Sequence, residues 1–122
     1  MLAIVFISLT GQTRRFVEKL SADQQLEIDD RNCDVTMKQP FLLIVPTYQE
    51  IVRELVDDFL AVEGNLEKCR GIVGAGNLNF AQLFCFTAKD ISRDYRIPLI
   101  HQIEFQGNET DVSYIKEVMR NG

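Results

Sequence analysis

Six consecutive residues near the start of the chain carry the functional groups of a phosphate-binding loop. Three bear hydroxyl groups, one bears an amide and one is glycine, in the order Ser8, Leu9, Thr10, Gly11, Gln12 and Thr13. Hydroxyls and backbone N–H groups donate hydrogen bonds to phosphate oxygens, and the N-terminus of a following helix adds positive potential. Glycine lets the backbone approach the phosphate closely. The loop therefore predicts a phosphate site, although a helix cap rich in serine and threonine would contain the same residue types.

The same loop excludes two other classes of protein. It contains no lysine and does not match the pattern G-x-x-x-x-G-K-[ST], which excludes a nucleoside-triphosphatase P-loop. The receiver domain of a response regulator needs acidic residues at the end of its first strand to hold a metal ion. This chain has Ser8, Leu9 and Thr10 at that position, so the receiver domain is excluded by its chemistry.

Two further loops carry groups that suit a flat heterocycle. In residues 46–50, Tyr48 could lay its ring against a planar ligand or could half-cover the core. Residues 74–80 contain two glycines and the amides of Asn77 and Asn79, which can bond the edge of a heterocycle. An ordinary strand-to-helix turn with Asn79 as the cap would also explain this loop. The case for a site therefore depends on whether the three loops meet.

Hydrophobic patterning places each of these loops behind a buried strand. Short unbroken apolar runs are typical of strands buried on both faces of a parallel sheet. Such runs span residues 2–7, 41–45 and, more weakly, 71–75. Apolar residues at helical spacing follow each of them, which predicts a helix after every loop.

The remaining elements complete an alternating pattern. Residues 26–28 are expected to form a short edge strand. Residues 98–105 are expected to form a second one, with Leu99, Ile103 and Phe105 on one face. A closing helix follows, with Thr110 as its predicted N-cap. Five strands and four helices in near alternation predict an α/β doubly wound sheet. Its ligand crevice lies at the carboxyl ends of the strands, where the three loops would come together.

Composition limits the remaining possibilities. The chain has 122 residues, the size of one domain, and a net charge of −5, which disfavours binding to nucleic acid. No apolar run is long enough to cross a membrane and no signal peptide is recognisable, so we expect one cytoplasmic domain over residues 1–122. Cys33, Cys69 and Cys85 form no C-x-x-C pair and are expected to be free thiols. No catalytic dyad or metal-ligating cluster is visible, so any chemistry would belong to a cofactor.

Several of these segments together resemble the NrdI-type flavodoxins, which activate the manganese form of class Ib ribonucleotide reductase. The most specific segments are residues 8–16 and residues 70–80, and the closing segment around Pro98 and 105–112 is also similar. The resemblance runs almost from end to end. It implies a flavodoxin-like five-stranded parallel sheet in the order 2-1-3-4-5. It also agrees with the helix-poor stretch between Ile28 and Phe41.

The resemblance implies a cofactor, flavin mononucleotide (FMN), and a set of contacts to it. The phosphate would be held by Ser8, Leu9, Thr10, Gly11, Gln12 and Thr13. The flavin ring would be flanked by Thr47, Tyr48 and Gln49 on one side and by Gly76, Asn77, Asn79 and Phe80 on the other. Reduced flavin and dioxygen would supply the oxidant that assembles the dimanganese–tyrosyl radical cofactor of the class Ib small subunit. A flavin-reducing electron donor is a further implied partner.

The second loop departs from the family pattern. Relatives commonly carry glycines after the Thr/Tyr pair, whereas this chain has Gln49 and Glu50. A peptide flip beside the flavin is easier with glycine, because one of its two conformers places a residue at positive φ. The substitution predicts weaker stabilisation of the one-electron-reduced flavin. It also keeps open two alternatives: a general electron-transfer flavodoxin, and a flavodoxin-like protein with weakened flavin binding.

Overall fold

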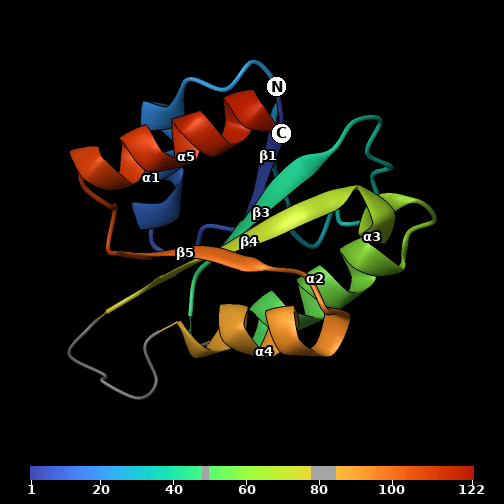
Figure 1. The fold of residues 1–122 in the computed structure, drawn as a ribbon. Coiled ribbons are helices and arrows are strands. Elements are labelled where there is room, and N and C mark those ends of the chain that lie inside the picture. Colours follow the sequence, from blue (N-terminus) through green and yellow to red (C-terminus); the bar gives the residue numbers. More distant parts are fainter. Residues whose placement is uncertain (48–49, 78–84) are drawn as a thin grey trace.

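The computed structural model contains a parallel sheet with helices on both of its faces (Figure 1). It describes residues 1–47, 50–77 and 85–122. The five strands are β1 (Ala3–Phe6), β2 (Gln25–Glu27), β3 (Phe41–Val45), β4 (Cys69–Gly76) and β5 (Leu99–Glu104). All neighbouring strands are parallel and their order is β2-β1-β3-β4-β5. The predicted fold class and strand order are therefore confirmed.

The helices divide between the two faces of the sheet. They are α1 (Gln12–Leu20), α2 (Glu50–Ala61), α3 (Asn65–Lys68), α4 (Phe86–Tyr95) and α5 (Glu109–Asn121). Helices α1 and α5 cover one face, and α2 and α4 cover the other (Figure 1). The sequence does not predict the short α3, so the described residues contain one helix more than the expected four. None of the helices in the described ranges is long and apolar enough to span a membrane.

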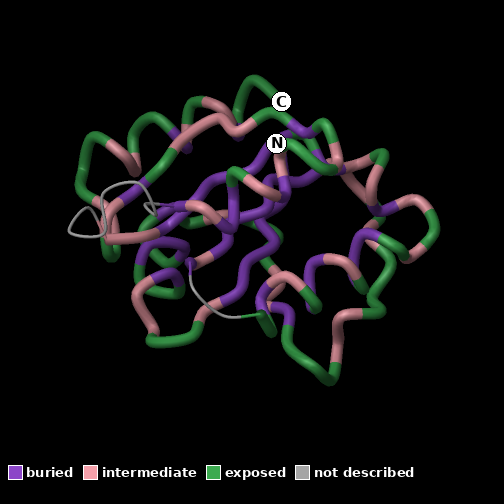
Figure 2. The backbone as a smooth tube through the Cα atoms, turned by 90° about the horizontal axis from the view of Figure 1, so that it is seen from below, coloured by how far each residue is buried: buried purple, intermediate pink, exposed green. Residues whose placement is uncertain are grey.

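The central strands are buried because they have helices on both sides. Every residue of β1 and β3 is buried, as the purple core of Figure 2 shows. Alternate side chains enter opposite layers: Val5 and Leu43 pack towards α2 and α4, whereas Ile4 and Leu42 pack towards α1 and α5. These apolar runs therefore correctly predict strands that are buried on both faces.

The edge strand β5 breaks the predicted alternation. Its pairing with β4 shifts between Ile72 and Val73, which pair with Leu99 and His101, so that one residue of β5 is skipped. Leu99 consequently packs on the side of α2 and α4, whereas Ile103 packs on the opposite side. The prediction that these two residues share a face is wrong, because an extra residue reverses the side-chain phase of a strand. Phe105 lies beyond the end of β5 and is exposed.

The last helix begins at a different cap from the one predicted. Asn108, not Thr110, is the N-cap of α5. Its side-chain oxygen accepts from the backbone N–H of Asp111, and the Asp111 carboxylate accepts from the backbone N–H of Asn108, both at 2.9 Å. This reciprocal pair satisfies two N–H groups at the helix start, whereas a threonine cap alone satisfies one.

The helix-poor stretch between β2 and β3 is held in place by one buried amide. Asn65, the first residue of α3, is 0% exposed. Its Oδ1 accepts from the backbone N–H of Met37 at 2.8 Å, and its Nδ2 donates to the carbonyls of Val35 and Phe59, each at 2.9 Å. One side chain thus links this stretch to α2, in addition to the turn hydrogen bonds within the stretch itself.

Candidate functional site

The three predicted loops meet in one cavity at the carboxyl ends of the strands. The cavity has a volume of about 370 Å³. Of the described residues, its walls contain Leu9, Thr10, Gln12, Thr13, Pro46, Thr47, Ala75, Gly76, Asn77 and Phe105. The topology brings these segments together because parallel strands end at the same edge of the sheet. The volume falls in the range of about 300–1,000 Å³ that is typical of small-molecule sites.

The first loop is shaped by Ser8. Its hydroxyl oxygen accepts from the backbone N–H groups of Gly11, at 3.1 Å, and of Arg14, at 3.4 Å. Gly11 has a φ of 90°, in the left-handed region that favours glycine, and a Cβ there would meet no atom within 4 Å. The backbone conformation therefore requires this glycine, and open space lies beside it. Ser8 supports the loop, whereas Thr10 and Thr13 line the cavity.

The side of the cavity formed by α1 offers neutral hydrogen-bond donors. Helix α1 begins at Gln12, and the first N–H groups of a helix have no carbonyl partner within it. The Thr13 side chain is buried and lines the cavity beside these groups. No charged side chain is among the described loop residues that line the cavity. This arrangement can hold an anion through N–H and O–H groups and the helix dipole.

Arg14, next to the loop, is paired elsewhere. Its Nε and Nη2 donate to the two carboxylate oxygens of Glu27 on β2, at 2.8 and 2.7 Å. This hydrogen-bonded pairing raises the pKa of Arg14. The guanidinium is thereby anchored at the edge strand and does not line the cavity.

Hydrogen bonds join the ends of β3, β4 and β5 beneath the cavity. Thr47 is buried, and its hydroxyl donates to the carbonyl of Ala75 at 2.6 Å, which joins the end of β3 to β4. The backbone N–H of Phe105 donates to the carbonyl of Gly76 at 3.0 Å, which joins β5 to β4. At Gly74 a Cβ would lie 2.8 Å from the Ala88 Cβ, so α4 packs directly on β4. These contacts fix the positions of the second and third loops where they leave the sheet.

The structure describes most of the predicted site residues and leaves four outside. Seven of those described line the one cavity, namely Leu9, Thr10, Gln12, Thr13, Thr47, Gly76 and Asn77, and Ser8 and Gly11 belong to the first loop. Tyr48, Gln49, Asn79 and Phe80 lie outside the described residues. The glycine-free step at Gln49 and the suggested Asn79 cap fall outside them as well.

Three cavity residues are absent from the set that the sequence predicts. Pro46 and Ala75 adjoin predicted positions, so only their contribution to the wall is new. The sequence places Phe105 on the apolar face of the last strand, although it lies beyond the strand end. Gly107 is a signal of a turn after the strand, because glycine is a preferred turn residue.

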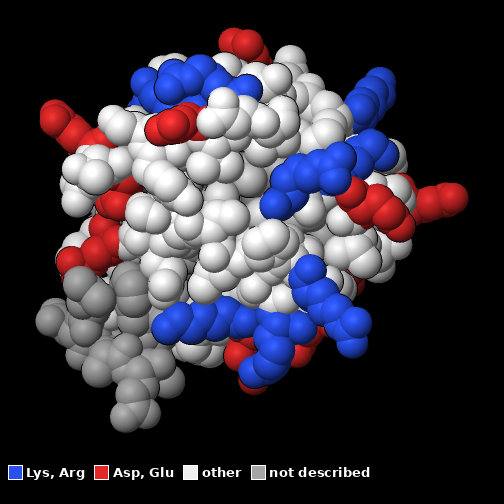
Figure 3. All heavy atoms as spheres, viewed as in Figure 1, with Lys and Arg blue, Asp and Glu red and all other residues white. Residues whose placement is uncertain are grey.

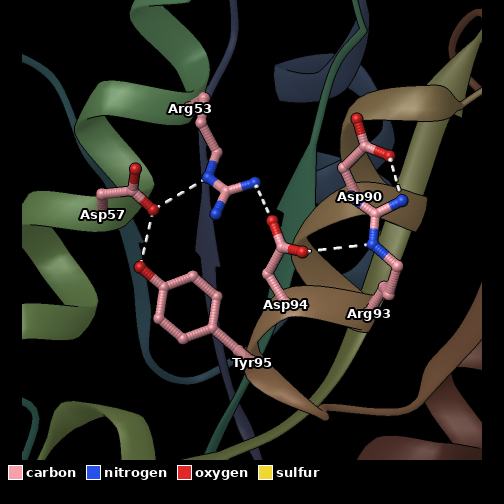
Figure 4. Close-up of polar contacts among 6 residues, drawn as sticks. All are labelled: Arg53, Asp57, Asp90, Arg93, Asp94 and Tyr95. Atoms are coloured by element: carbon pink, nitrogen blue, oxygen red, sulfur yellow. Dashed lines mark hydrogen bonds and ion pairs between the residues drawn. The ribbon is translucent and has the colours of Figure 1, made fainter.

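A polar network joins the helices that follow the second and third loops (Figure 4). Arg53 on α2 donates to the carboxylates of Asp57, at 2.8 Å, and Asp94, at 2.9 Å. The Tyr95 hydroxyl donates to Asp57 at 2.6 Å. Burial acts to lower the pKa of Arg53, but the hydrogen bonds to the two carboxylates outweigh it and raise the pKa. The network therefore holds α2 against α4.

The charges on the molecular surface do not form a continuous basic face on the side shown in Figure 3. Lys and Arg side chains are interspersed there with Asp and Glu side chains. A surface that binds duplex nucleic acid needs clustered cations that neutralise phosphates. This mixed pattern agrees with the net charge of −5.

The chain is similar to NrdI proteins along nearly its whole length. Residues 4–117 match the family model described as "NrdI Flavodoxin like". An NrdI-like protein of Streptococcus pyogenes serotype M3 is 34% identical, covering 97% of this chain and 87% of the relative. Protein NrdI of Mycoplasma genitalium is 32% identical, covering 97% of this chain and 82% of the relative.

Solved flavodoxin structures share the fold at lower sequence identity. The solution structure of two-electron reduced Megasphaera elsdenii flavodoxin superposes with a TM-score of 0.64 at 15% identity, covering 100% of both chains. A short-chain flavodoxin associated with a bacterial microcompartment gives the same TM-score and identity, covering 98% of this chain and 95% of that one. At this identity the likeness shows the fold alone.

Proposed function

We propose that this chain, which belongs to the NrdI flavodoxin-like family, binds FMN in the cavity at the carboxyl ends of β1, β3 and β4. The observation that carries this proposal is the convergence of the three loops on one cavity. We propose further that the protein supplies reducing equivalents or oxidant for assembly of the dimanganese–tyrosyl radical cofactor of class Ib ribonucleotide reductase. Family membership supports this second step.

The residues around the cavity fit the two ends of FMN. At one end, the N-terminus of α1, the hydroxyls of Thr10 and Thr13 and the open backbone at Gly11 suit a phosphate. At the other end, Thr47, Gly76 and Asn77 present backbone and amide groups beside apolar wall atoms, which suits a flat heterocycle. When bound, the flavin supplies one- and two-electron transfer, including transfer to dioxygen.

The proposal assigns roles to individual residues at the cavity. Thr10, Gln12 and Thr13 hold the phosphate through hydroxyl and backbone N–H groups, and Ser8 keeps the loop in the required conformation. Thr47 fixes the floor under the ring through its bond to the Ala75 carbonyl. Family resemblance adds ring contacts from Tyr48, Gln49, Asn79 and Phe80. The partners are the dimanganese small subunit and an electron donor that reduces the flavin.

The first experiment tests the cofactor. The purified protein is expected to show the absorption bands of oxidised flavin and to release FMN on denaturation. Apoprotein prepared by denaturation and refolding is expected to bind added FMN at a ratio of one per chain. A colourless protein that does not bind added FMN would contradict the proposal and favour a flavodoxin-like protein that acts by contact alone.

The second experiment tests the redox role. Reduced holoprotein, a manganese-loaded class Ib small subunit and dioxygen are mixed, and the tyrosyl radical is measured by electron paramagnetic resonance. We expect radical formation with the holoprotein and none when free FMN or hydrogen peroxide replaces it. A protein that binds FMN but forms no radical with its own organism's small subunit would favour a general electron carrier.

A further inference from the structure

Phe105 has a backbone conformation that is costly for a residue with a Cβ and that glycine or asparagine would adopt more easily. Its φ is 53°, in the left-handed region that a residue with a Cβ adopts only at a cost. The other described non-glycine residues with positive φ are Ser21, Cys85 and Arg96, and each caps a helix. Phe105 caps no helix and lies in the turn between β5 and α5.

The surrounding turn holds Phe105 in this conformation. Its N–H donates to the Gly76 carbonyl at 3.0 Å, and the N–H of Gly107 donates to the Glu104 carbonyl at 2.9 Å. At Gly107 a Cβ would lie 2.6 Å from the ring of Phe16, so the turn is pressed against α1. The turn is therefore fixed on both sides, and Phe105 is held as part of it.

The side chain of Phe105 is placed for contact with a ligand. It is 47% exposed, so packing in the core accounts for only part of its surface. It lines the same cavity as Thr13 and Gly76. In the sheet, β5 is separated from β1 by β3 and β4, and three spacings between neighbouring strands amount to about 14 Å. The cavity thus extends from an anion-binding end at β1 to an aromatic side chain contributed from beyond β5.

We propose that Phe105 contacts the flat heterocycle of the bound ligand, and that the strained turn exists to present its ring there. Aromatic rings pack against one another in offset or edge-to-face arrangements and bury apolar area when they do so. The inference rests on the proposed function, since it assigns an additional contact within the same site. It predicts that the ring of Phe105 contributes to affinity while its backbone conformation opposes folding.

The decisive variant is Phe105→Gly, because it separates these two effects. Glycine adopts a φ of 53° freely, so the thermal midpoint of the apoprotein is expected to stay equal or rise. Loss of the ring is expected to weaken FMN binding about tenfold, measured by quenching of flavin fluorescence. Riboflavin lacks the phosphate, and its affinity is expected to fall by the same factor. A role in packing alone would lower the thermal midpoint and leave both affinities unchanged.

Two further variants of Phe105 and one control complete the test. Phe105→Leu keeps the Cβ and the apolar volume but lacks the aromatic ring. Flavin affinity should therefore still be lower than in the unmodified protein, and the absorption spectrum of the bound flavin should change. Phe105→Tyr keeps an aromatic ring and should retain the affinity and the spectrum of the unmodified protein. Tyr114→Ala is the matched control, because Tyr114 is 42% exposed on α5 and does not line the cavity. Unchanged flavin affinity in Phe105→Gly and Phe105→Leu would overturn the inference. A loss confined to FMN, with riboflavin unaffected, would also overturn it. Failure of the unmodified protein to bind FMN would instead refute the proposed function.

Discussion

The substitution Asn65→Ala is expected to destabilise the protein strongly, because it removes a buried amide that bonds to three separate segments of the chain. Asn65 is 0% exposed and makes hydrogen bonds to Met37, Val35 and Phe59. Alanine removes all three. The Phe59 carbonyl keeps a bond from the N–H of Val62, at 3.3 Å. Within the described part of the chain, the Met37 N–H and the Val35 carbonyl have no second hydrogen bond to replace the lost one.

The magnitude follows from the groups that lose their partners. A fully buried polar group left without a partner costs about 1–3 kcal/mol. The Met37 N–H and the Val35 carbonyl are only partly buried, so water replaces part of their lost bonds and each costs about 1 kcal/mol. Together with the loss of the buried bond to the Phe59 carbonyl, the free energy of unfolding should fall by about 2–3 kcal/mol. This is a large share of the roughly 5–15 kcal/mol that stabilises a domain of this size.

Urea denaturation followed by circular dichroism measures this loss. Asn121→Ala is the control, because Asn121 is an exposed residue at the end of α5 and should change stability by less than about 0.5 kcal/mol. Since α3 precedes β4 and lies at the end of the sheet away from the cavity, the folded fraction of Asn65→Ala should keep its FMN affinity. A stability loss under about 1 kcal/mol would refute the view that this amide holds the stretch between β2 and β3.

Three further outcomes are expected. Thr13→Val removes a hydroxyl from the anion-binding end, so the affinity for FMN should fall about tenfold while that for riboflavin stays unchanged; equal losses for both ligands would contradict the assignment. Hydrogen bonds from Arg53 lower the pKa of Asp94 below its ordinary value of 3.8, so this pair stabilises the fold above that pH and its contribution is lost as the pH falls through the lowered pKa. The stability difference between the unmodified protein and Arg53→Met should therefore stay constant from about pH 7 down to about pH 4 and shrink as the pH falls further, and a difference that does not shrink in acid would argue against the pairing. Burial raises the pKa of the thiols of Cys69 and Cys85 to about 12, so a disulfide reagent at about pH 8 should modify Cys33 alone in the native protein and all three cysteines after unfolding.

The fold could be predicted because its strongest signals in the sequence are local and repeated. The unbroken apolar runs of β1 and β3 can be buried only between two layers of helices, so the runs alone indicated a parallel sheet. The hydroxyl-rich loop after β1 predicts a phosphate site, because its hydrogen-bonding groups and its position at the end of a strand both favour one. Both predictions depend on residue type and spacing, which the sequence contains directly.

Prediction failed where a backbone irregularity changed the phase of the pattern. The extra residue in β5 reversed the faces of Leu99 and Ile103, and no glycine or proline within the strand marks that shift. The same limit hid Phe105: the sign of a φ angle is decided by the whole turn, and the close contact of Gly107 with Phe16 was not visible in the sequence. The reciprocal cap of Asn108 and Asp111 could have been found, because both residue types and their spacing fit the known motif.

The two edges of the sheet bear on how the protein behaves at high concentration. An exposed strand edge offers unpaired N–H and carbonyl groups to another chain, and long, regular edges promote aggregation. Here one edge, β2, has only three residues and is followed closely by Asp29 and Asp30, and the other, β5, has a shifted register. Neither edge offers a long straight template for another strand. The irregularity that reverses the side-chain phase of β5 thus also protects an open sheet from joining its neighbours edge to edge in solution.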